Sequence, residues 1–141
     1  VKAIINAGIP VEGHLGLTPQ SIHKFGGYGV RAKEDAEAER LMASAKALDE
    51  AGAFGITLEK VPAELAHKVT QQIKGITIGI GAGPYTDGQV LVHTDALGMT
   101  EGFKPKFLRH FAEVGQCMKD GISQYVKCVK EGSFPNETES Y

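Results

Sequence analysis

The sequence predicts an α/β fold, half of a (β/α)8 barrel with parallel strands and outer helices. Short β-rich runs alternate with segments of helical period, which is typical of βαβ units. No Gly-rich dinucleotide fingerprint follows the first strand, and this absence disfavours a doubly wound sheet. Four βα units make half of a barrel, which typically has about 250 residues. A small open sheet is the alternative.

The first three strands and two helices follow from periodicity. Residues 9–14, 54–59 and 76–81 alternate in the manner of strands. Between the first two strands, apolar residues recur at helical spacing over 38–48, and Gly52 is placed to end that helix. Pro62 begins the next helix, which continues through Leu65, Val69 and Ile73.

The segment after Gly81 allows two interpretations. Residues 89–92 could form a strand, but parallel neighbours normally need a crossover of about ten residues or more. We therefore expect a helix over 87–97, with a capping box from Thr86 to Gln89 and a stop at Gly98. A strand over 106–111 and a long helix over 113–130 then complete four βα units.

The alternation of side chains predicts an apolar and a polar face. We expect residues 54, 56, 58 and 76, 78, 80 to pack against the outer helices. Residues 55, 57, 59 and 77, 79, 81 would face the barrel interior near its mouth, with Glu12 and His14 of the first strand. Because an isolated half would leave two strand edges open, a complementary half is expected in the same gene product or in a partner.

Glu59 is the strongest catalytic candidate. It ends its strand at the carboxyl side, where barrel enzymes assemble their active sites. It could instead form a salt bridge with Lys60 or cap the next helix. His14 has the same placement on the first strand, although a buried neutral imidazole bonded to backbone carbonyls is the alternative. Glu12, two residues deeper, could pair with a cation from the missing half.

Residues 15–33 make a long βα loop, and residues 132–141 make a C-terminal tail. Loops of this length are usually functional lids or mobile segments. Lys24, Arg31 and Lys33 in the loop could meet an anionic ligand or be solvated surface charges. The glycines at 79–83 lack the Lys-Ser/Thr of a phosphate-binding P-loop.

Composition excludes some classes of protein. Lys+Arg 15 against Asp+Glu 17 gives a net charge of −2, which argues against a general nucleic-acid binder. The longest apolar stretch has about eight residues, whereas a membrane span needs about 18. Cys117 and Cys128 would lie roughly 16 Å apart on one helix, so they cannot pair, and reduced thiols in the cytoplasm are expected. Because the chain begins at Val1, we expect it to be part of a longer protein.

Several long motifs are similar to those of ketopantoate hydroxymethyltransferase. They are residues 13–21 (Gly-His-Leu-Gly-Leu-Thr-Pro-Gln-Ser), 25–28 (Phe-Gly-Gly-Tyr), 58–66 (Leu-Glu-x-Val-Pro-x-Glu-Leu-Ala), 77–83, 87–92 and 132–135. Over essentially its whole length the chain resembles the C-terminal half of that enzyme, which implies that it forms the second half (strands 5–8) of the barrel. Lys60 and Glu12 depart from the residues common in the family at those positions.

The resemblance implies transfer of a hydroxymethyl group from 5,10-methylenetetrahydrofolate to 3-methyl-2-oxobutanoate, giving 2-dehydropantoate. It makes Glu59 the general base and places His14 in the substrate pocket. It also implies Mg²⁺, whose ligands belong to the N-terminal half, so no metal ligand is assigned here. A homo-oligomer is expected. A non-catalytic barrel fragment that packs with other chains, and a related magnesium-dependent enzyme that enolises a 2-oxo acid, are the alternatives.

Overall fold

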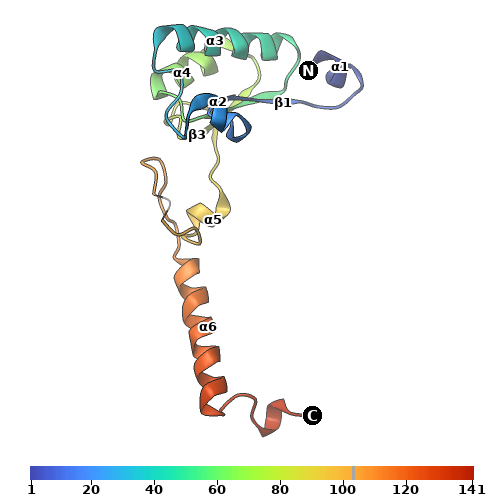
Figure 1. The fold of residues 1–141 in the computed structure, drawn as a ribbon. Helices are drawn as coiled ribbons and strands as arrows, with labels where there is room; N and C mark the ends of the chain where they lie inside the picture. The colour runs from blue at the N-terminus through green and yellow to red at the C-terminus, as the bar shows by residue number, and fades with distance from the viewer. Residues whose placement is uncertain (103) are drawn as a thin grey trace. The chain divides into compact units, whose positions relative to one another are not determined.

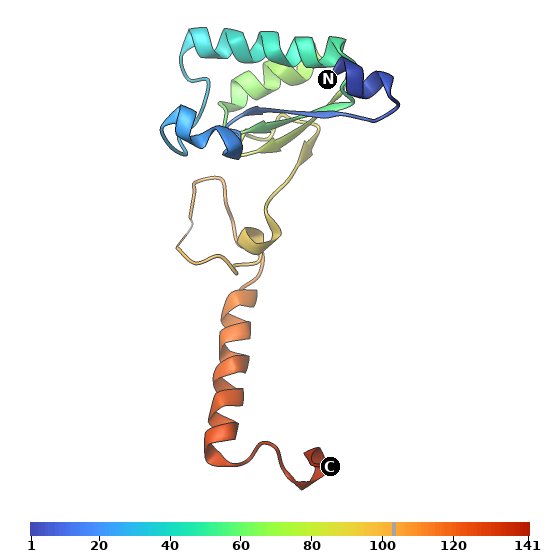
Figure 2. The same ribbon diagram turned by 45° about the vertical axis from the view of Figure 1, so that its right-hand side comes forward.

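The computed structural model describes residues 1–102 and 104–141, which form two compact units, Val1–Val90 and Leu91–Tyr141. The first unit holds the sheet (Figures 1 and 2). Its elements in chain order are α1 (Lys2–Asn6), β1 (Glu12–Gly16), the 3-10 helix η1 (Pro19–Ser21), α2 (Ile22–Phe25), α3 (Asp35–Glu50), β2 (Gly55–Glu59), α4 (Ala63–Gln72), β3 (Ile76–Ile80) and β4 (Gly88–Gln89).

The sheet has four strands in the order β1-β2-β3-β4, and every neighbouring pair is parallel. Helices α3 and α4 pack on one face of it, as Figure 2 shows. This arrangement confirms the predicted α/β class and corresponds to half of a (β/α)8 barrel. The helices predicted over 38–48 and after Pro62 are confirmed as α3 and α4. The first strand begins three residues later than predicted, at Glu12, and runs to Gly16.

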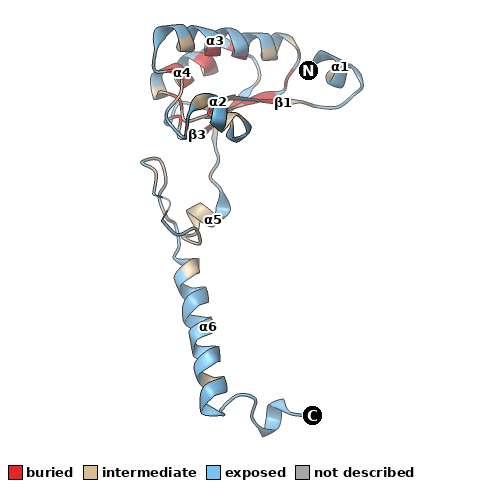
Figure 3. Ribbon diagram, viewed as in Figure 1, coloured by how far each residue is buried: buried red, intermediate tan, exposed pale blue. Residues whose placement is uncertain are grey.

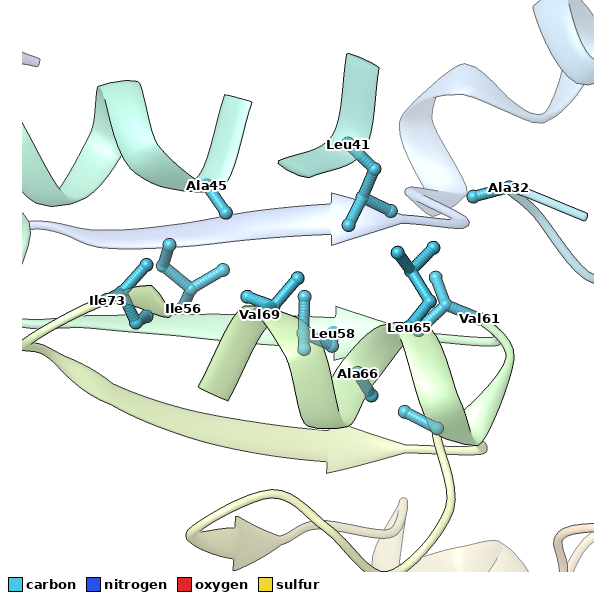
Figure 4. Close-up of a cluster of buried hydrophobic side chains, with 11 residues drawn as sticks. Ala32, Leu41, Ala45, Ile56, Leu58, Val61, Leu65, Ala66, Val69 and Ile73 are labelled. Carbon is cyan, nitrogen blue, oxygen red and sulfur yellow. The ribbon is translucent and has the colours of Figure 1, made fainter. Parts of the chain in front are cut away.

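The core lies between the sheet and the two helices (Figures 3 and 4). Ile56 and Leu58 of β2 are 1% and 0% exposed, which confirms two of the three residues predicted for its apolar face. Phe54, the third, precedes the strand and is 50% exposed, so its predicted burial under the helices is wrong. Apolar side chains of α3 and α4 cover Ile56 and Leu58. The buried cluster consists of Ala32, Leu41, Ala45, Ile56, Leu58, Val61, Leu65, Ala66, Val69, Ile73 and Ala82.

The predicted faces of β3 are reversed. Thr77 is paired in register with Ile56, and Ile80 with Glu59, so Thr77 lies on the helix side and the isoleucines lie on the other face. Thr77 is 0% exposed, whereas Ile76 is 49% exposed. Alternation determines which residues share a face, but the choice of face depends on packing. Here Thr77 is buried because its hydroxyl has hydrogen-bond partners in α4 and in the turn before β4.

The helix predicted over 87–97 is wrong, because residues 88–89 form β4 and only His93–Ala96 form a short helix, α5. The connection between β3 and β4 is short, but β4 pairs only with Ile78 and Gly79. The chain therefore has to run back along β3 by only two residues, which a connection shorter than the usual crossover can do. Asp87 fixes this return, since its Oδ2 accepts hydrogen bonds from the Thr77 amide (2.7 Å) and hydroxyl (2.9 Å).

In the second unit, α5 precedes α6 (Val114–Glu131) and the 3-10 helix η2 (Glu137–Glu139). Helix α6 confirms the prediction for 113–130, but the strand predicted over 106–111 is wrong, because these residues form a turn and loop. Cys117 and Cys128 on α6 are both free, as predicted. None of the helices in the described part of the chain has the length and apolar character of a membrane span.

Candidate active site

The two leading candidate residues, His14 and Glu59, lie together on neighbouring strands. Glu59 is the last residue of β2, as predicted, whereas the prediction that His14 ends its strand is wrong, because β1 continues to Gly16. Their strands are parallel neighbours with His14 opposite Thr57 and Gly16 opposite Glu59, so both side chains project from the same face of the sheet. His14 Nε2 lies 3.1 Å from Glu59 Oε2, within hydrogen-bond distance. The side chains are 36% and 17% exposed on the sheet face opposite α3 and α4. The structure therefore joins an acid and an imidazole that are 45 residues apart in the sequence.

A second polar pair lies two residues deeper on the same two strands. The hydroxyl of Thr57 donates a hydrogen bond of 2.6 Å to Glu12 Oε1. The sequence places both residues on the polar face but gives no sign that they bind each other. The pairing depends on the register of β1 against β2, which sets Glu12 opposite Gly55 and beside Thr57.

The backbone at the end of β2 is tightly packed against the end of β1. The Leu17 amide donates to the Glu59 carbonyl oxygen at 2.9 Å, and the Lys60 amide donates to the Ile80 carbonyl oxygen at 2.9 Å. Gly16 has a φ of +89°, and a Cβ at this position would lie 2.2 Å from the Glu59 carbonyl oxygen. A glycine is required here because no side chain fits between these strands.

The alternative interpretation of Glu59, a salt bridge to Lys60, does not describe the structure. Lys60 directs its Nζ to the backbone carbonyl oxygen of Tyr28, whereas Glu59 has His14 as its side-chain partner. The sequence gives no sign of the contact between Lys60 and Tyr28, which are 32 residues apart, or of the left-handed backbone conformation of Lys60, with a φ of +48°. Left-handed conformations are uncommon outside glycine and leave no clear signal in a sequence.

The loop over 15–33 is partly helical, since it contains η1 and α2. Of its three candidate cations, Arg31 binds the Glu37 carboxylate and stacks over the Phe25 ring, with 4.1 Å from the guanidinium carbon to the ring centroid. Lys24 and Lys33 are exposed. Arg31 thus has an internal partner and contributes to ordering the loop.

The residues at this site do not make a magnesium site by themselves. Mg²⁺ prefers near-octahedral oxygen ligands, and the two carboxylates present bind Thr57 and His14. Across residues 1–102 and 104–141, no group of three or more His, Cys, Asp and Glu side chains is arranged to hold a metal ion.

A parallel α/β half-barrel with a carboxylate at the carboxyl ends of its strands has the architecture of a barrel enzyme. The chain belongs to the ketopantoate hydroxymethyltransferase family, whose sequence profile matches residues 1–137.

Curated relatives carry the name 3-methyl-2-oxobutanoate hydroxymethyltransferase. Those from Caldicellulosiruptor saccharolyticus, Bacteroides thetaiotaomicron and Thermoanaerobacter sp. are 57%, 58% and 52% identical to this chain over all 141 residues. The match covers 53%, 52% and 52% of those proteins, so the chain spans about half the length of these relatives and corresponds to their C-terminal half.

Proposed function

We propose that this chain supplies the catalytic base of a hydroxymethyltransferase that acts on 3-methyl-2-oxobutanoate. The observation that carries the proposal is the contact of 3.1 Å between His14 of β1 and Glu59, the last residue of β2. The name shared by the relatives supplies the substrate and the type of reaction. The chain contributes this part of the site, and the N-terminal half of the barrel contributes the rest.

Glu59 removes the proton on C3 of the oxo acid. The electron pair of that C–H bond then forms the new carbon–carbon bond to the one-carbon unit, for which we propose 5,10-methylenetetrahydrofolate as the donor. Both bonds from the methylene carbon to the folate nitrogens break, water supplies the hydroxyl oxygen, and the nitrogens leave protonated as tetrahydrofolate. His14 holds Oε2 of the carboxylate, which leaves Oε1 to receive the proton. A carboxylate fixed in this way is pre-oriented toward the substrate and loses little freedom when it reacts.

The third strand supplies an apolar wall beside the base. Ile80 is paired in register with Glu59, and Ile78 with Thr57, so their side chains share the face that carries the carboxylate. The substrate has a branched apolar end and a charged oxo acid end. Contact of its methyl groups with Ile78 and Ile80 would direct C3 toward Glu59.

We propose that Mg²⁺ is held by the N-terminal half, because the carboxylates of this site are otherwise engaged. When bound, the metal would stabilise negative charge on the oxo group after the proton has left. No residue of this chain is proposed as its ligand. We further propose that the active enzyme is a homo-oligomer in the cytoplasm.

Proton exchange at C3 tests the role of Glu59 directly. The chain is combined with a separately expressed N-terminal half of the Bacteroides thetaiotaomicron relative, and exchange of the C3 proton is followed by NMR in deuterated water with Mg²⁺. We expect Glu59→Gln to slow exchange by about 100-fold or more, since general bases typically contribute factors of about 10² to 10⁴.

Glu39→Gln is the matched control, because Glu39 is exposed on α3 and carries the same chemical change. It should leave the exchange rate unaltered. Exchange at the wild-type rate in Glu59→Gln would refute the assignment of the base. Absence of exchange in every combination of halves would favour the non-catalytic fragment. Exchange that is not followed by formation of 2-dehydropantoate when 5,10-methylenetetrahydrofolate is added would favour a folate-independent enolising enzyme.

A further inference from the structure

Lys60 is the residue at which three separate segments meet. Its amide donates to the Ile80 carbonyl oxygen at 2.9 Å, and its carbonyl oxygen accepts from the Arg31 amide at 2.7 Å. Its Nζ donates to the carbonyl oxygen of Tyr28. One residue directly after the proposed base therefore binds the end of β3 and two positions in the loop over 15–33.

The same loop is bound near its beginning by Glu59. The Leu17 amide donates to the Glu59 carbonyl oxygen at 2.9 Å, and Leu17 is 1% exposed. Residues 59 and 60 thus bind the loop near its beginning, at Leu17, and near its end, at Tyr28 and Arg31. Between these points the loop has glycines at 26, 27 and 29, and a cation–π contact between Arg31 and Phe25 closes it internally.

The backbone of Lys60 supports a specific role for its side chain. Its φ of +48° is a conformation in which glycine is favoured and a lysine is strained. Glycine would adopt this conformation without strain, but it would lack the ammonium group that binds the loop. The partner is a neutral backbone oxygen of the loop, and Glu59 is left to His14.

We propose that Lys60 is a positioning residue that fastens the 15–33 loop to the end of β2 and thereby fixes Glu59 in place. The link to Glu59 rests on the function proposed above, whereas the fastening of the loop does not. Lys60 acts through Tyr28 and Arg31, which carry the loop, and makes no contact with the reacting atoms.

Amide hydrogen exchange of the chain without substrate tests the fastening. Lys60→Met should raise the exchange rate of the Arg31 amide and of neighbouring loop amides by about ten-fold, because the ammonium donor is lost. Lys60→Arg should restore protection, since a guanidinium can also donate to the Tyr28 carbonyl. Lys60→Gly relieves the strain but lacks the donor, so its loop should exchange as fast as in Lys60→Met even if the fold is stabilised.

Lys33→Met is the matched control, because Lys33 is an exposed lysine of the same loop, and it should exchange like the wild type. Wild-type exchange in Lys60→Met would overturn the fastening, and so would a failure of Lys60→Arg to restore protection.

The link to the base is tested in the assay of C3 exchange described above. Lys60→Met should lower kcat by about ten-fold with little change in KM, and Lys60→Arg should recover most of it. A released loop with unchanged kcat would overturn the positioning of Glu59. Failure of the proposed function is distinguishable, since loop exchange is measured without substrate and does not depend on Glu59 being a base.

Discussion

Alanine at position 16 would place a methyl group where the end of β2 already stands. A Cβ on Gly16 would lie 2.2 Å from the Glu59 carbonyl oxygen and 2.7 Å from Cγ1 of Val61. The carbonyl oxygen cannot move freely, because it accepts the hydrogen bond of the Leu17 amide. Gly16→Ala should therefore separate the ends of β1 and β2 at the residue that we propose as the base.

Gly16→Ala should lower the free energy of unfolding for two reasons. Gly16 has a φ of +89°, and forcing an alanine into the left-handed region costs about 1 kcal/mol. Relief of the overlap adds about 2 kcal/mol, which is typical of an extra methyl group in a packed region. We expect the free energy of unfolding to fall by about 3 kcal/mol in total.

Gly26→Ala is the matched control, because Gly26 also has a positive φ, +70°, but a Cβ there has nothing within 4 Å. Only the conformational part, about 1 kcal/mol, should be lost. The difference of about 2 kcal/mol between the two variants corresponds to about 30-fold in the folding equilibrium.

The measurement is the urea dependence of amide exchange in β1 and β2. With a slope of about 2 kcal/mol per molar urea, the midpoint should shift by about 1.5 M in Gly16→Ala and by about 0.5 M in Gly26→Ala. Equal shifts in the two variants would refute the claim that contact with the Glu59 carbonyl oxygen, rather than backbone conformation, requires glycine at position 16.

Two further predictions concern the packing that supports the site. Leu58→Ala should lower the free energy of unfolding by about 3 kcal/mol, because Leu58 is 0% exposed. Ile9→Ala is the control, since the Ile9 side chain is 55% exposed, and it should change the free energy of unfolding by less than about 0.5 kcal/mol. Equal losses of stability in urea unfolding would contradict the observed core. Asp87→Ala should lower the free energy of unfolding by about 2 kcal/mol, because the buried amide and hydroxyl of Thr77 lose the Asp87 carboxylate as acceptor. The amide of Val90, which donates to the Gly79 carbonyl oxygen, should then exchange faster. Unchanged exchange at Val90 would show that Asp87 does not hold β4.

Elements with strong periodicity could be predicted from the sequence. The 3.6-residue pattern gave α3, α4 and the long helix α6, because each repeats its apolar positions over several turns. The strand β2 was also predictable, since its alternation continues to Glu59. The start of β1 was misplaced because pairing with Gly55 begins only at Glu12.

Features that depend on tertiary contacts could not be predicted in this way. Thr77 has a polar side chain, which predicts exposure, but hydrogen bonds to Thr70 and Asp87 allow it to be buried. Asp87 lies in a turn for which the sequence predicts a helix. Likewise, β4 pairs with β3 at only two positions, and a strand of this length is too short to show an alternation of period two.

The corrected faces of β3 strengthen the argument for the site. Had Ile76, Ile78 and Ile80 faced the helices as predicted, the face that carries Glu59 would have been polar or glycine-lined on all of the first three strands. Instead β1 and β2 contribute His14 and Glu59, while β3 sets Ile80 directly beside the carboxylate. A site with a polar side and an apolar side orients a substrate that is itself divided in this way, as the proposed oxo acid is. We expect the apolar Ile80 to reduce the access of water to the carboxylate that we propose as the base.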